Sequence, residues 1–219
     1  MLKAVLFDVD GTLGDTLPLC VEAYRTTVYE LRGQRPSAQE VVSHFGLSDR
    51  GVLGALLGMH PDDAELPIGH FVQVYCRLLP QMAPAPFDGV AEMLAGLRRA
   101  GLRLGIVTGK EACTARPTFT AFGLDEAGFE WFGFGSPFSN VKAQRLREGA
   151  DFFGISPAEL LYVGDAPSDI TLAHAAGVRI LNAAWAPDSD SCREACLAEK
   201  PDFRLSDIRD VLPLILSLI

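Results

Sequence analysis

The chain has 219 residues, 48% of them hydrophobic, and its 28 acidic residues against 19 basic ones give a net charge of −9. This length and composition allow a full buried core, either as one large domain or as a core with an inserted domain. Because the sequence has neither a basic patch nor an apolar run of membrane-spanning length, it argues against nucleic acid or a membrane as a partner.

The first predicted element is a strand over residues 3–7, an apolar run too short for an ordinary helix. The chain enters this strand directly after Met1 and Leu2, without the pattern of a signal peptide, so we expect a cytoplasmic protein. Side chains alternate along a strand, and Asp8 and Asp10 can therefore point the same way at its carboxyl end.

The two carboxylates of Asp8 and Asp10 predict a cation site. Neighbouring carboxylates repel each other and are costly to desolvate unless positive charge lies between them. Mg²⁺ suits so few ligands because it keeps several waters and accepts substrate phosphate as a ligand. An Asp-x-Asp-Gly sequence is also a common surface turn. Its position directly after an apolar strand favours the Mg²⁺ site.

Residues 16–86 predict a small helical domain. Apolar residues recur at helical spacing from Val21 to Leu31, and residues 33–36 predict a turn. Two further helices are predicted at 41–57 and 68–79, and no strand lies between them. Prolines bound the segment, at Pro18 and between 80 and 86. We therefore expect residues 16–86 to form a cap domain inserted into the core, with the two linkers as hinges.

The remaining chain, residues 1–15 and 87–219, predicts an α/β core. Beyond the first strand, we expect strands at 104–107, 160–163 and 179–181, and helices at about 111–121, 143–153 and 168–176. Apolar stripes from Val90 to Leu97, ended by Gly101, and from Val211 to Leu216 predict two further helices. This alternation predicts a doubly wound, Rossmann-like parallel sheet with helices on both faces. Ligands bind beyond the carboxyl ends of such strands, where Asp8, Thr108 and Asp165 fall.

Three stretches of sequence carry a family resemblance. They are LFDVDGTLGDTL at residues 6–17, the apolar run 103–107 followed by Thr108-Gly109, and the apolar run 160–163 followed by Gly164, Asp165 and then Asp169. Together they resemble the haloacid dehalogenase-like hydrolase superfamily, and within it phosphoglycolate phosphatase-like members with a helical cap. That family also has a Lys or Arg usually followed by Pro. The matching Lys142 is followed by Ala143 instead.

The resemblance implies a phosphoryl transfer site. Asp8 would be the nucleophile and Asp10 the general acid and base, which agrees with the chemistry that paired carboxylates offer. Thr108 and Lys142 would hold the phosphate oxygens, with Gly11 and Gly109 beside them in the phosphate-binding loops. Two alternatives stay open at this point: Thr108 could be a helix N-cap, and Arg145 or Arg147 could replace Lys142.

The resemblance also implies the metal ligands. They are the Asp8 side chain, the Asp10 backbone carbonyl and Asp165, with Asp169 as an outer or water-mediated ligand that orients Lys142. Asp169 could instead be an ordinary acidic residue in the first turn of a helix. Residues 44–50 look like the substrate-specificity loop of related caps, and we expect Arg50 to meet a substrate carboxylate, unless this segment is only a joint between helices.

These observations predict a Mg²⁺-dependent phosphatase acting on a small phosphorylated metabolite through an aspartyl-phosphate, with phosphoglycolate as one candidate, as a monomer or homodimer. The first alternative is a phosphomutase of the β-phosphoglucomutase type. Those mutases carry a His in the first cap segment, where this chain has Cys20. The second alternative is a binding protein that keeps the fold without chemistry. We expect Cys20 to be a packing residue, and Cys192 and Cys196 to be free thiols.

Overall fold

A parallel sheet forms the centre of the computed structural model, which describes residues 1–125, 128–187 and 189–219. Within these ranges the sheet has six strands in the order β3-β2-β1-β4-β5-β6. Their bounds are β1 Ala4–Phe7, β2 Arg103–Val107, β3 Phe129–Gly133, β4 Leu160–Gly164, β5 Arg179–Ala183 and β6 Phe203–Leu205. Every pairing is parallel. The predicted doubly wound fold is therefore confirmed, with β3 and β6 as additional edge strands.

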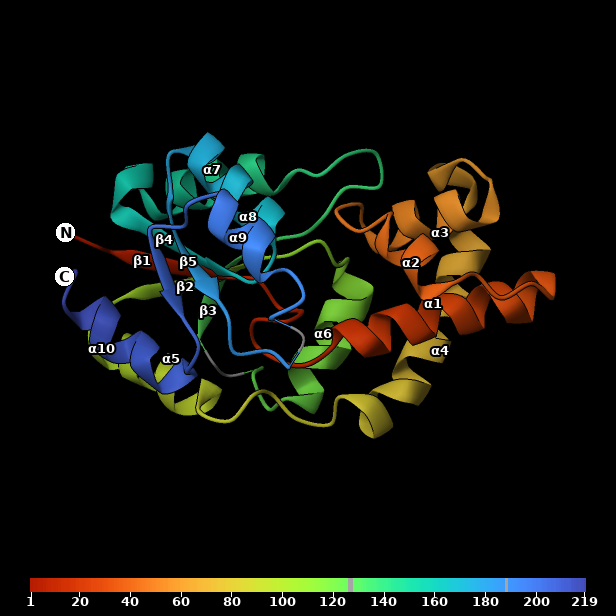
Figure 1. Ribbon diagram of the computed structural model, residues 1–219, viewed down its shortest axis with the longest axis horizontal. Coiled ribbons are helices and arrows are strands. Elements are labelled where there is room, and N and C mark those ends of the chain that lie inside the picture. The colour runs from red at the N-terminus through yellow and green to blue at the C-terminus, as the bar shows by residue number, and fades with distance from the viewer. Residues whose placement is uncertain (126–127, 188) are drawn as a thin grey trace.

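Helices cover both faces of the sheet (Figure 1). One face carries α5 (Val90–Arg99) and α10 (Val211–Leu216), and the other carries α7 (Lys142–Phe153), α8 (Pro167–Ala176) and α9 (Arg193–Ala198). Side chains along β1 alternate between the two faces of the sheet. Val5 and Phe7 belong to the hydrophobic cluster that includes residues of α5 and α10, whereas Leu6 belongs to the cluster that includes residues of α7 and α8. β1 is thus buried on both sides.

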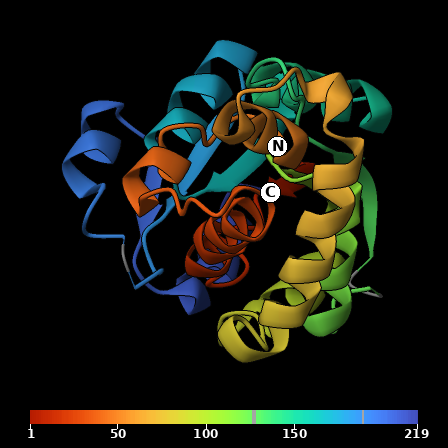
Figure 2. The same cartoon turned by 90° about the vertical axis from the view of Figure 1, so that its right-hand side faces the viewer.

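Four helices lie beyond one end of the sheet, and Figure 2 looks onto them with the strands behind. They are α1 (Leu17–Arg32), α2 (Ala38–Val42), α3 (Asp49–Leu57) and α4 (Glu65–Met82). The antiparallel pair of α1 and α4 is joined by the Tyr24 and Phe71 rings, stacked with their centroids 4.3 Å apart. These helices occupy the segment for which we predict a cap, residues 16–86.

The expected helix over 41–57 is wrong in one respect, since two helices replace it. α2 ends at Val42 and α3 begins at Asp49. Between them, Gly46 has a backbone φ of +108°, which only glycine adopts readily, so a continuous helix cannot pass through it.

The four helices are docked on the core by polar contacts. Ser48 donates its backbone N–H to the carbonyl of Ser136 at 2.9 Å, and the Tyr75 and Thr118 hydroxyls are 2.8 Å apart. The connection from β2 continues into α6 (Ala112–Ala121), the core helix against which α4 packs. None of the helices in the described ranges is both long and apolar enough to cross a membrane.

Candidate active site

The loop after β1 brings the first two predicted carboxylates to the carboxyl edge of the sheet. Asp8 is buried, and its Oδ1 accepts a hydrogen bond from the N–H of Val9 at 2.7 Å. The chain then turns sharply at Gly11, where φ is +71° and an added Cβ would come within 2.4 Å of Asp165 Oδ2. A glycine is required there by both the backbone conformation and the space. The turn therefore holds the loop of β1 against the loop of β4.

Lys142 lies in the centre of this site. Its ammonium is 2.5 Å from Asp8 Oδ2 and 2.6 Å from Asp169 Oδ1. Burial alone would lower the pKa of Lys142, but attraction to Asp169 and Asp8 raises it well above its usual value, so the ammonium stays charged. The rival arginines bond elsewhere: Arg145 donates to the carbonyl of Phe134 and Arg147 to that of Ala175.

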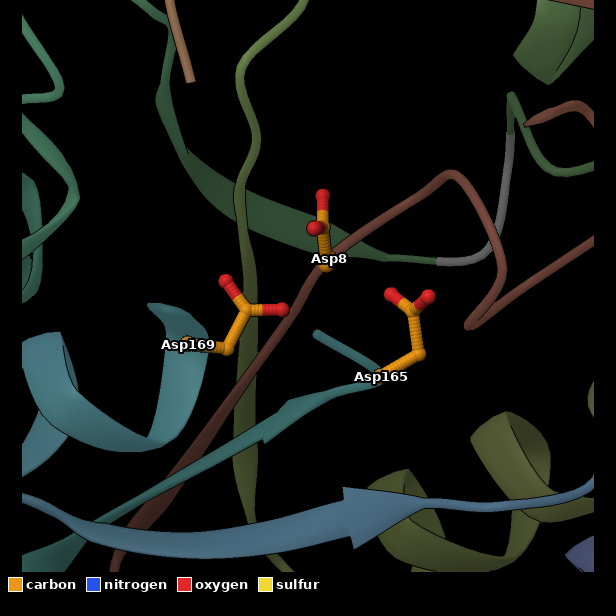
Figure 3. A group of neighbouring side chains, drawn as sticks. All are labelled: Asp8, Asp165 and Asp169. Carbon is orange, nitrogen blue, oxygen red and sulfur yellow. The ribbon is translucent and has the colours of Figure 1, made fainter. Parts of the chain in front are cut away.

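Three carboxylates, those of Asp8, Asp165 and Asp169, converge at this edge of the sheet (Figure 3). One oxygen each from Asp8, Asp165 and Asp169 lies within 4.8 Å of the others. Burial raises the pKa of Asp8 to about 6, although Lys142 acts in the opposite direction, and burial together with Asp169 and Asp8 raises the pKa of Asp165 well above its usual range. Carboxylate oxygens that lie this close together form a set that a hard divalent cation fits.

Two interpretations were possible for Asp169: a carboxylate that orients Lys142, or an ordinary acidic residue in the first turn of a helix. The structure shows both features. Asp169 lies in the first turn of α8 and accepts a hydrogen bond from the N–H of Ala166 at 3.2 Å. Its other oxygen binds Lys142. The local helix geometry thus fixes the carboxylate that orients the lysine.

Thr108 and Gly109 follow β2 at the same edge of the sheet. Thr108 is buried, and its hydroxyl accepts a hydrogen bond from the N–H of Lys110 at 3.3 Å. The N-cap of α6 is Glu111, so the alternative of Thr108 as a helix N-cap is wrong. Gly109 lines the cavity described next, together with Asp8, Lys142 and Asp165.

A cavity of about 740 Å³ lies between the sheet edge and the four helices. Its floor contains the carboxylates and Lys142, and its walls contain apolar residues of α1, α2 and the α2–α3 segment, such as Val21, Val42 and Phe45. The size and the mixture of apolar walls with a few polar groups are typical of a small-molecule site.

Comparison with known proteins identifies the family. The model of the haloacid dehalogenase-like hydrolases matches residues 5–183, most of the chain. The chain belongs to the haloacid dehalogenase-like hydrolase family. The resemblance predicted from the motifs is confirmed.

Several relatives match this hydrolase over most of its length. A phosphoglycolate phosphatase of Thiobacillus denitrificans is 30% identical over 80% of this chain and 80% of its own. A phosphoglycolate phosphatase of Escherichia coli O157:H7 is 27% identical over 97% of this chain and 92% of its own. A crystal structure of a predicted phosphoglycolate phosphatase from Haemophilus somnus superposes with a TM-score of 0.79 at 24% identity, covering 98% of each chain, and supports the fold. Like these phosphatases, the chain is a hydrolase that falls in the phosphoglycolate phosphatase-like subgroup.

Arg50 does not take the place expected for it. Its guanidinium is 2.8 Å from Glu65 and 4.0 Å from Glu111, and it is not among the cavity-lining residues of the described chain. The expected loop nevertheless contributes Phe45, Gly46 and Leu47 to the cavity. A role of Arg50 in substrate binding stays a prediction, and its two glutamate partners do not support it.

Sequence reasoning missed a second buried lysine of this hydrolase. Lys110 lies 3.1 Å from Asp10 Oδ1, and its ammonium also donates to Cys20 Sγ at 3.2 Å. Cys20 lines the cavity, so its description as a packing residue is incomplete. The only signal in the sequence was the position of Lys110, two residues beyond Thr108 at a strand end.

Asp49 is another buried carboxylate that the motifs do not contain. It accepts hydrogen bonds from the Tyr24 hydroxyl at 2.7 Å, the Glu111 N–H at 2.9 Å and the Thr114 hydroxyl at 2.5 Å. The first comes from α1 and the other two from the start of α6. Asp49 thus ties the α1–α4 helices to the core directly above the site.

Proposed function

We propose that this hydrolase is a Mg²⁺-dependent phosphatase that cleaves a small phosphate monoester through an aspartyl-phosphate on Asp8. The observation that carries the proposal is the contact of Lys142 with both Asp8 and Asp169 at the floor of a covered cavity. This arrangement places a nucleophile, a fixed cation and a cation-binding carboxylate cluster in one place. The names of the relatives, phosphoglycolate phosphatase, support the same chemistry.

The residues would divide the reaction between them. An Asp8 oxygen would attack phosphorus, with Lys142, the Thr108 hydroxyl and neighbouring backbone N–H groups, including Gly109, holding the other phosphate oxygens. Asp10 would give a proton to the leaving alcohol. It would then take a proton from the water that hydrolyses the phosphoaspartate, which restores the Asp8 carboxylate.

The carboxylates are a suitable set of Mg²⁺ ligands. Asp8 and Asp165 would bind the ion directly with the backbone carbonyl of Asp10, and Asp169 would act through water or through Lys142. Bound Mg²⁺ would supply the positive charge that lets a carboxylate and a phosphate dianion approach each other. The convergence of one oxygen each from Asp8, Asp165 and Asp169 within 4.8 Å of one another supports this ligand set.

Residues 16–86 would act as the cap of this site. Water must be excluded while the phosphoaspartate forms, and the helices α1–α4 cover the cavity. Opening at the linkers would release the products. We propose phosphoglycolate as the first candidate substrate, because relatives with 27% and 30% identity are named phosphoglycolate phosphatase. We further propose that the enzyme acts in the cytoplasm as a monomer or homodimer.

The test is release of inorganic phosphate from a panel of esters, each assayed with Mg²⁺ and with excess EDTA. The panel contains phosphoglycolate, 2-hydroxyethyl phosphate as its counterpart without the carboxylate, sugar phosphates and inorganic pyrophosphate. We expect Mg²⁺-dependent turnover of at least one monoester, with one phosphate released for each ester consumed. Full activity after exhaustive metal removal would contradict the proposal, and conversion to an isomeric phosphate without release would favour the mutase.

A further inference from the structure

Lys110 is a buried cation to which the proposed phosphatase reaction assigns no role. Its side chain is 2% exposed. The ammonium lies 3.1 Å from Asp10 Oδ1, 3.2 Å from Cys20 Sγ and 4.6 Å from the centre of the Tyr75 ring. An ammonium has three N–H donors, and these three neighbours account for all of them. Lys110 borders the cavity, but with its donors directed at these neighbours it is placed to act on them rather than on a substrate.

The contacts of Asp10 are concentrated on one of its two oxygens. Oδ1 accepts hydrogen bonds from the Thr16 hydroxyl and, at 3.5 Å, from Cys20, in addition to the ion pair with Lys110. None of the contacts found among the described residues reaches Oδ2. Proton transfer requires a carboxylate oxygen within hydrogen-bond reach of the leaving oxygen. Asp10 lines the cavity, and holding Oδ1 in this way leaves Oδ2 as the oxygen available for proton transfer.

The surroundings of Lys110 come from both parts of the molecule. Lys110 and Asp10 belong to core loops, whereas Cys20 lies on α1 and Tyr75 on α4. With these helices in place the ion pair is shielded from water, and an ion pair is stronger in a medium of low dielectric. The orientation of Asp10 is thus most firmly fixed when the helices cover the site.

We propose that Lys110 is a positioning residue for Asp10, whose ammonium anchors Oδ1 so that Oδ2 meets the ester oxygen. This inference rests on the proposed phosphatase function. As the Asp8 oxygen bonds to phosphorus, the bond from phosphorus to the ester oxygen breaks, and its electron pair goes to that oxygen. The proton on Asp10 Oδ2 moves to the same oxygen, so the product leaves as a neutral alcohol. Lys110 takes part only by fixing the direction of Asp10.

The test compares Lys110→Met, Asp10→Asn and the double variant on two esters that differ in their need for a proton. An alkyl phosphate such as 2-hydroxyethyl phosphate requires protonation of its leaving oxygen, whereas 4-nitrophenyl phosphate releases a stable anion. The quantity measured is kcat/KM, which depends on all steps from substrate binding up to the departure of the leaving group. For Lys110→Met we expect a loss of about 10-fold to 10²-fold on the alkyl ester, a part of what positioned acid–base groups contribute. The loss on the aryl ester should be several-fold smaller, and KM should change little.

The double variant provides the second readout. If Lys110 acts through Asp10, removing both groups costs no more than removing Asp10 alone, because residues that act as a unit are not additive. Lys3→Met is the matched control, since Lys3 is a half-exposed lysine paired with Glu159 on the opposite edge of the sheet, and it should keep wild-type kinetics. If Lys110→Met does not fold, Lys110→Gln, which keeps one donor for Oδ1, carries the same comparison with a smaller expected loss.

Two results would overturn the inference. One is an equal loss on both esters, which would assign Lys110 to general stability or to phosphate binding. The other is multiplication of the two single losses in the double variant, which would make Lys110 independent of Asp10. If the wild-type enzyme instead fails to hydrolyse any ester in the presence of Mg²⁺, the proposed function itself is wrong and this inference falls with it.

Discussion

Replacing Asp8, the proposed nucleophile, should make the metal-free protein more stable. Burial raises the pKa of Asp8 from 3.8 to about 6 in the folded protein, against the attraction of Lys142. A carboxyl group whose pKa is raised by folding binds protons more tightly in the folded state than in the unfolded state. The free energy of unfolding therefore falls as the pH rises from about 4 to about 6, and it stays lower above that range.

The shift of about two pKa units corresponds to about 3 kcal/mol at neutral pH, at 1.36 kcal/mol for each unit. In Asp8→Asn the side chain cannot ionise, while Asp169 still holds the Lys142 ammonium at 2.6 Å. We therefore expect the variant to be up to about 3 kcal/mol more stable than the wild type at pH 7 to 8 and equally stable near pH 4. The same variant should lose turnover and form no covalent species, because an amide is a poor nucleophile.

The measurement is urea unfolding in EDTA from pH 4 to pH 8, read as the difference between variant and wild type. Asp151→Asn, an exposed change on α7, is the control and should show no such difference. Added Mg²⁺ should raise the free energy of unfolding of the wild type, since a ligand that binds only the folded state stabilises it. The rise should be much smaller for Asp8→Asn, which lacks one of the proposed ligands. A variant less stable than the wild type at pH 7 would refute the reasoning, because it would mean that Lys142 outweighs burial.

Three further changes test single contacts. Lys142→Ala should lower kcat/KM by about 10²-fold or more, as for other fixed charge donors, whereas Arg145→Ala should leave it nearly unchanged; the opposite result would mean that the phosphate cation is misassigned. Arg50→Ala should leave KM for the best ester nearly unchanged in steady-state assays, because this guanidinium binds Glu65 and Glu111, and a large rise in KM would restore its predicted substrate role. Asp49→Ala leaves three donors without their acceptor and should lower the unfolding free energy in urea by about 3 kcal/mol; a neutral effect would show that this contact between the helices and the core is dispensable.

The sheet was predictable where its strands are buried on both faces. β1, β2 and β4 are almost entirely buried and appear in the sequence as continuous apolar runs. β3 is an edge strand in which Glu130 and Phe132 are exposed, and β6 has three residues that are all half-buried. β3 alternates half-buried and exposed residues and β6 is only three residues long, so neither has the continuous apolar run that marks the strands buried on both faces.

The site was predictable where a residue stands at the end of a strand. Asp8, Thr108 and Asp165 follow β1, β2 and β4, and parallel strands bring their carboxyl ends together whatever the intervening sequence contains. Lys110 has the same kind of position, but its role depends on Cys20 and Tyr75, which approach it from two separate helices. No local pattern encodes that encounter, so the partners of Lys110 could be found only in the folded chain.

The helix that begins at Lys142 shows how a missing motif residue is replaced. Where relatives of this family usually have Pro after the lysine, this chain has Ala143, and a proline would have fixed the first turn by its restricted φ. Here the Asn140 side chain accepts a hydrogen bond from the Lys142 N–H at 3.1 Å, the kind of local turn that asparagine forms readily. α7 therefore still begins at Lys142. From this first position the side chain reaches Asp8 and Asp169, so the site depends on where the helix begins rather than on which residue fixes its beginning.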